Sequence, residues 1–125
     1  MEALRELVQI MAQLRDPDHG CPWDQRQTYE SIVPYTLEEA YEVADAIQRG
    51  DMDELRDELG DLLFQIVFYS QIASEEGHFG FDDVARGICD KMIRRHPHVF
   101  ADAEYVDDWS LARDFRILAK TLPAK

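Results

Sequence analysis

The chain has 125 residues, 46% of them hydrophobic, which fits one globular domain over residues 1–125. Its net charge of −13 argues against a sequence-independent binder of nucleic-acid polymers, because an acidic surface repels phosphate, although metal ions could screen a small phosphorylated ligand. No apolar run is long enough for a membrane span, and the N-terminus lacks the pattern of a secretory signal. The two cysteines are far apart in sequence, as is typical of reduced thiols. We therefore expect a cytoplasmic protein with no membrane partner.

Hydrophobic residues recur at helical spacing along almost the whole chain. The expected helices run, in chain order, from Leu4 to about Arg15, from after Pro34 to Gly50, from Asp51 or Asp53 to about Glu76, from about Asp82 to Arg95, and from about Trp109 to Ala119. Residues 16–27, which include two prolines and a glycine, are expected to form a loop. Because the loops are short, the helices should pack antiparallel as an all-α helical bundle. The third helix is apolar on most sides from Leu59 to Ile72, which predicts a homodimer or higher homo-oligomer as well as a core.

Carboxylates concentrate on the second and third expected helices. Glu39 and Glu42 share a helix sector with apolar residues, and Glu58 and Asp61 do the same on the next helix. Antiparallel packing would bring these two pairs together near one end of the bundle, whereas Glu38 falls on the more polar side. Since burying carboxylates is costly without a positive partner, a site for a divalent cation is the first hypothesis.

The ligand type favours one class of metal over others. Hard carboxylate oxygens, with no His or Cys in either segment, predict Mg²⁺, with Mn²⁺ as a substitute, rather than zinc. A di-iron bundle would usually carry Glu-x-x-His on two helices, whereas the matching positions here are Glu42 and Asp61. A competing interpretation is a capping box from Thr36 to Glu39, with Glu38 and Glu39 also suited to the positive end of the helix dipole. This interpretation does not explain why Glu42, Glu58 and Asp61 also lie on faces that otherwise look buried.

The most concentrated basic run lies at residues 90–98. Lys91 and Arg95 are spaced so that both can reach one ligand, such as a phosphate, but cations near a helix C-terminus are equally expected from the helix dipole. His96 and His98 are expected to cap or solvate the turn rather than to bind metal. Trp109 can stack on a nucleobase, although tryptophans more often serve as buried packing.

Four motifs resemble those of MazG nucleoside triphosphate pyrophosphohydrolases, a family of all-α enzymes. They are Cys21-Pro22-Trp23-Asp24, Tyr35-Thr36-Leu37-Glu38-Glu39, Glu58-Leu59-Gly60-Asp61-Leu62-Leu63-Phe64 and Arg94-Arg95-His96-Pro97-His98-Val99-Phe100. The resemblance runs from the first helix to about Asp102, and residues 102–125 depart from the family pattern.

This resemblance implies a dimerising fold that hydrolyses nucleoside or deoxynucleoside triphosphates to the monophosphate and pyrophosphate. The implied Mg²⁺ ligands are Glu39, Glu42, Glu58 and Asp61, and Glu38 is the implied additional acid that orients or deprotonates a water. The implied substrate contacts are Lys91, Arg95 and Trp109.

From these features we expect a metal-activated water to attack the α-phosphorus, with pyrophosphate as the leaving group. Two alternatives stay open. One is a related all-α pyrophosphohydrolase specific for dUTP, dCTP, phosphoribosyl-ATP or a modified nucleotide. The other is a non-enzymatic helical module that binds Mg²⁺ or Ca²⁺, or docks a basic partner.

Overall fold

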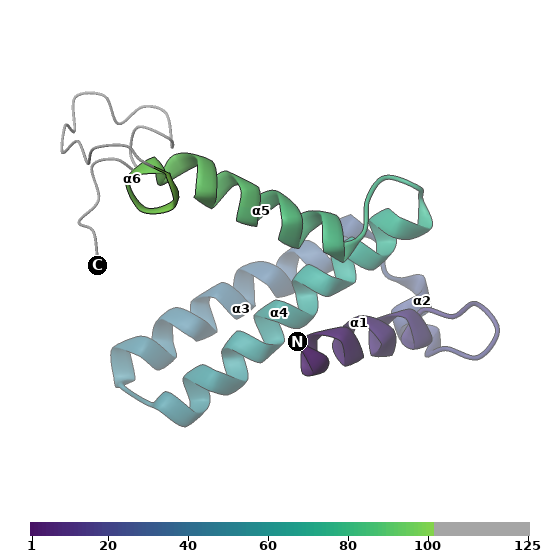
Figure 1. Ribbon diagram of the computed structural model, residues 1–125. Coiled ribbons are helices and arrows are strands. Elements are labelled where there is room, and N and C mark those ends of the chain that lie inside the picture. Colours follow the sequence, from purple (N-terminus) through teal and green to yellow (C-terminus); the bar gives the residue numbers. More distant parts are fainter. Residues whose placement is uncertain (102–125) are drawn as a thin grey trace. The chain divides into compact units, whose positions relative to one another are not determined.

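The computed structural model describes residues 1–101, which form helices and loops and, within that range, no strand (Figure 1). The helices are α1 (Glu2–Leu14), α2 (Pro22–Arg26), α3 (Tyr29–Arg49), α4 (Met52–Glu75), α5 (Phe81–Arg95) and α6 (Pro97–Phe100). The all-α prediction is therefore confirmed. The chain divides after Phe81 into two compact units, so each unit is described by itself. In the described part of the chain, no helix combines the length and the apolar character needed to cross a membrane.

The first unit is built on an antiparallel hairpin of two long helices, α3 and α4 (Figure 1). Gly50 ends α3 in the left-handed conformation, with a φ of 69°, and Asp51 caps α4 by accepting from the backbone N–H of Glu54. Helix α1 packs against α4. The buried core joins α1, α3 and α4 through Met11, Ile32, Val67, Phe68 and Ile72.

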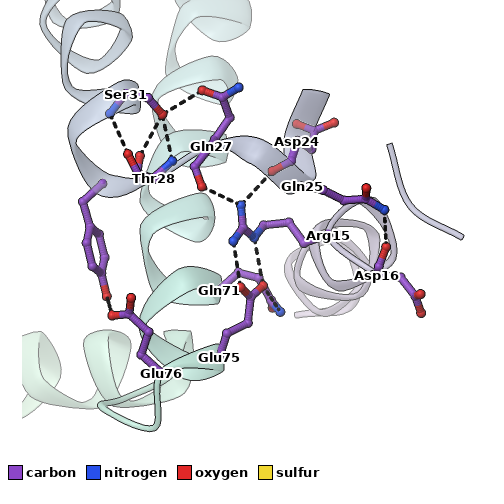
Figure 2. A network of polar contacts seen from close by, with 11 residues as sticks. Arg15, Asp16, Asp24, Gln25, Gln27, Thr28, Ser31, Gln71, Glu75 and Glu76 are labelled. Atoms are coloured by element: carbon purple, nitrogen blue, oxygen red, sulfur yellow. Dashed lines mark hydrogen bonds and ion pairs between the residues drawn. The ribbon is translucent and has the colours of Figure 1, made fainter. Parts of the chain in front are cut away.

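Arg15, which directly follows α1, connects three parts of this unit. Its guanidinium donates to both carboxylate oxygens of Glu75, at 2.7 and 2.8 Å, and to the carbonyl oxygens of Asp24 and Gln27 (Figure 2). The guanidinium carbon also lies 5.6 Å from the centre of the Phe68 ring. These contacts tie α1, α2 and the segment before α3 to the C-terminal end of α4.

Three features differ from the sequence predictions. Helix α3 begins at Tyr29 rather than after Pro34, because Thr28 caps it and exchanges hydrogen bonds with Ser31. Pro34 lies inside the helix but is exposed. Because proline has no backbone N–H, the carbonyl one turn earlier loses its hydrogen-bond donor, and water can take the place of that donor.

The predicted loop at residues 16–27 contains the short α2, and the sequence predictions did not include α6. Both helices begin with a proline, at a position where a missing N–H costs little. The ends of α1, α4 and α5 agree with the predictions within one or two residues. The helix predicted around Trp109 lies outside the described residues.

Candidate functional site

Carboxylates from α3 and α4 meet in the half of the hairpin that is nearer to its turn. Oxygen atoms of Glu39, Glu58 and Asp61 lie within 4.8 Å of one another, and so do oxygen atoms of Glu42, Glu54 and Glu58. Glu58 belongs to both groups, so the two form one continuous cluster between the helices. Such spacing lets several carboxylates contact one cation.

The cluster is partly withdrawn from water. Asp61 is exposed, but the other members are half-buried. Within residues 1–101, Oε2 of Glu39 is buried and has no hydrogen-bond partner. A buried carboxylate oxygen without a donor is unfavourable, and a bound cation would supply what it lacks.

The electrostatics of the cluster agree with this interpretation. Partial burial is the main cause that raises the pKa of Glu39, and repulsion from Asp61 and Glu42 adds to it, although a hydrogen bond with Glu58 acts in the opposite direction. The pKa of Glu58 is raised to about 7, first by burial and then by its hydrogen bond and charge repulsion with Glu39. No basic group contributes to the pKa shifts of Glu39 and Glu58, whereas Glu54, at the edge of the cluster, pairs with Arg49 at 3.0 Å. The hard oxygens of the cluster fit Mg²⁺ or Mn²⁺ in ligand type.

The structure brings Glu39, Glu42, Glu58 and Asp61 together, as their helix faces suggest, and their role as metal ligands stays a prediction. Glu38 is exposed and belongs to neither group of converging carboxylates. Sequence reasoning missed Glu54. A signal for it exists, because Glu54 precedes Glu58 by one helical turn and so shares its face.

The capping-box interpretation of Thr36 to Glu39 is wrong, because both residues lie in the interior of α3. The helix is capped by Thr28 instead. The Thr36 hydroxyl is 2.6 Å from Oε1 of Gln65 and 2.5 Å from the hydroxyl of Tyr69, so it joins α3 to α4.

The predicted phosphate-binding residues belong to the second unit. Lys91 and Arg95 are half-buried and lie in the C-terminal half of α5, Arg95 at its last residue. His96 follows α5, begins α6 as its N-cap and has Nδ1 2.7 Å from the carbonyl of Met92, which agrees with its expected place in the turn. Since the two units are described separately, a joint action of these residues with the carboxylates stays a prediction. Trp109 lies outside the described residues.

Residues 27–100 match the family model of the MazG nucleotide pyrophosphohydrolase domain. The chain belongs to this family. The match begins just before α3 and ends with α6, so it includes every carboxylate of the cluster as well as Lys91 and Arg95.

Curated relatives support the same assignment over most of the chain. A nucleoside triphosphate pyrophosphohydrolase of Escherichia coli K12 is 62% identical over 103 residues, which are 82% of this chain and 39% of that protein. A protein of Thermotoga maritima named nucleoside triphosphate pyrophosphohydrolase/pyrophosphatase MazG is 53% identical over 98 residues, 78% of this chain and 38% of its own length. The chain thus spans about two fifths of the length of these relatives.

A solved structure shows the same fold. The crystal structure of a mazG-related protein from Thermotoga maritima aligns with a TM-score of 0.68 and covers 98% of this chain and 100% of its own. The two sequences are 22% identical, so this likeness concerns the arrangement of the helices.

Proposed function

We propose that this chain hydrolyses nucleoside and deoxynucleoside triphosphates to the monophosphate and pyrophosphate, with Mg²⁺ as cofactor and Mn²⁺ as a substitute. The observation that carries the proposal is the convergence of carboxylates from α3 and α4, with the pKa of Glu58 raised to about 7 by burial and by its acidic neighbours. The names of the curated relatives supply the reaction.

The proposed metal ligands are Glu39, Glu42, Glu58 and Asp61, and Glu54 joins them because it converges with Glu42 and Glu58. Bound Mg²⁺ would neutralise the triphosphate and lower the pKa of a water for attack on the α-phosphorus. Without a cation the cluster would repel the substrate, so metal is needed for binding as well as for chemistry.

The other predicted site residues would act on the attacking water, the leaving group and the nucleotide rather than bind metal. Glu38 adjoins Glu39 on α3 but is exposed, so its carboxylate is free of the cluster and would accept a proton from the attacking water or orient it. Lys91 and Arg95 would neutralise the leaving pyrophosphate, and Trp109 would contact the nucleotide.

We also propose that the chain forms a homodimer or a higher homo-oligomer through its long helices. Several large apolar side chains of α3 and α4 are exposed, among them Tyr41 at 76%, Leu37 at 59% and Leu59 at 48%. Apolar surface of this kind on a helix pair favours burial against a second copy. Light scattering coupled to size-exclusion chromatography tests the proposal, and a monomeric mass at micromolar concentration would contradict it.

The site assignment is tested with Glu42→Gln and Asp61→Asn, each of which removes one charge and keeps the side-chain shape. Both variants should remain folded and lose most Mg²⁺-dependent pyrophosphate release. Glu30→Gln is the matched control, because Glu30 lies on α3, is exposed and belongs to the first turn of the helix, more than two turns before Glu39. Full activity in both cluster variants would refute the assignment.

A further inference from the structure

A neutral polar cluster of Thr36, Gln65 and Tyr69 joins α3 to α4 beside the carboxylates. Thr36 precedes Glu39 by about one turn on α3, and Gln65 follows Asp61 by about one turn on α4. The hydroxyl of Thr36 reaches across to Gln65 and Tyr69 at 2.6 and 2.5 Å. The neutral cluster therefore forms the next layer of the helix pair, on the side of the carboxylates that faces away from the hairpin turn.

The hydrogen bonds of this cluster run in one direction. Oε1 of Gln65 can only accept, so Thr36 donates its single proton to it, in preference to the carbonyl of Ile32 at 3.3 Å. Tyr69 must then donate to Oγ1 of Thr36. Its ring is held in place by stacking on Tyr29, with ring centres 6.5 Å apart.

This chain of bonds fixes Gln65 through its carbonyl oxygen alone. Within residues 1–101, the two N–H groups of its Nε2 atom have no hydrogen-bond partner. An amide whose carbonyl oxygen is held by Thr36, which Tyr69 in turn holds, and whose two N–H donors remain available is suited to recognise an acceptor on a ligand.

We propose that Gln65 is a specificity-determining residue whose amide donates a hydrogen bond to a sugar hydroxyl of the bound nucleotide. This inference rests on the function proposed above. On the turn side of the site, an open cavity of about 500 Å³ is lined only by acidic residues, namely Asp51, Asp53, Glu54, Asp57 and Glu58. Metal-bound phosphates belong on that acidic side. The sugar, whose hydroxyls are uncharged acceptors, then belongs at the neutral layer with Gln65.

The test combines a change in the protein with a change in the substrate. Wild type, Gln65→Met and Gln65→Asn are compared on ribo-, deoxy- and dideoxynucleoside triphosphates with Mg²⁺, as KM and kcat separately. Affinities for the corresponding monophosphates are measured by calorimetry, which gives a readout apart from turnover. Gln71→Met is the matched control, because Gln71 lies on the same helix and bonds Glu75 instead.

In wild type, removal of the contacted hydroxyl should weaken binding about fivefold, the worth of one neutral hydrogen bond. In both Gln65 variants that difference should disappear, while kcat changes little and Gln71→Met behaves as wild type. The contacted hydroxyl is the 2′-hydroxyl if wild-type affinity falls from the ribo- to the deoxynucleotide. It is the 3′-hydroxyl if affinity falls from the deoxy- to the dideoxynucleotide.

The inference is wrong if the folded variants bind the ribo-, deoxy- and dideoxynucleotides all more weakly by the same factor. It is also wrong if their binding of all three is unchanged. If wild type releases no pyrophosphate from any nucleotide, the proposed function fails instead. The two failures are therefore distinguishable.

Discussion

Substituting methionine for Arg15 removes the guanidinium that ties α1 and α2 to the end of α4, and it keeps an apolar side chain of similar length. The variant loses a two-point ion pair with Glu75 and leaves the carbonyls of Asp24 and Gln27 without their donor. The Arg15 side chain is only 9% exposed, so water replaces little of what it loses, whereas the Glu75 side chain is 35% exposed and is partly solvated. We expect the free energy of unfolding to fall by about 3 kcal/mol.

That loss corresponds to a fall in Tm of about 10 °C for a chain of this length. Thermal unfolding followed by circular dichroism measures it. Arg56→Met is the matched control, because Arg56 is 77% exposed and lies 3.9 Å from Asp57, so its removal should change Tm little. A loss of less than about 1 kcal/mol in Arg15→Met would refute the reasoning, since exposed ion pairs already reach that value.

The same variant has a pH signature. The hydrogen bond from Arg15 lowers the pKa of Glu75, so this pair stabilises the fold above the unfolded-state pKa, and the contribution is lost as pH falls through the folded-state pKa. The difference in stability between wild type and Arg15→Met should therefore shrink in acid. Because Glu75 lies several turns along α4 from Asp61, the variant should keep the rise in Tm that Mg²⁺ produces.

Three further predictions concern the carboxylates and the hairpin. Glu39→Gln should raise the Tm of the metal-free protein, because it lowers the charge repulsion within the cluster. It should also reduce the increase in Tm that Mg²⁺ produces. If Mg²⁺ increases the Tm of the variant as much as that of wild type, Glu39 is not a metal ligand. In metal-free protein the pKa of Glu58 is raised to about 7, above that of the unfolded chain, so its contribution to stability is complete at acid pH and is lost as pH rises through about 7. Tm measured at a series of pH values should fall as pH rises through about 7 in the absence of Mg²⁺, and should fall less in its presence. A Tm that does not change over this range without metal would contradict the raised pKa of Glu58. Asp51→Ala removes the cap of α4 and should cost about 1 kcal/mol in urea unfolding, whereas a neutral result would show that the cap contributes nothing.

The parts of the fold that the sequence predicted are those set by local pattern. Apolar periodicity and the stop at Gly50 located α4 and the end of α3, and the helix wheel placed Glu39 and Glu58 on facing sides. The start of α3 was mispredicted because Pro34 suggests a boundary, while the Thr28 cap and the burial of Ile32 favour an earlier one.

Features that depend on contacts distant in sequence could not be predicted. Helix α2 lies in a stretch rich in turn residues, and its position depends on Arg15, whose partners come from separate segments. The helix wheel places Glu54 on the face of Glu58, but its convergence with Glu42 depends on how α3 and α4 pack against each other, which a helix wheel does not give. The connection from Thr36 to Gln65 and Tyr69 likewise requires the two helices to be in register.

The most direct test of the proposed hydrolysis is the identity of the products released from the common NTPs and dNTPs, with Mg²⁺ and with EDTA. The proposed site predicts equal amounts of monophosphate and pyrophosphate with Mg²⁺ and neither product with EDTA. Orthophosphate would place the cleavage at the γ-phosphate and contradict attack at the α-phosphorus. Pyrophosphate release that persists in EDTA would contradict the role given to the carboxylates of α3 and α4.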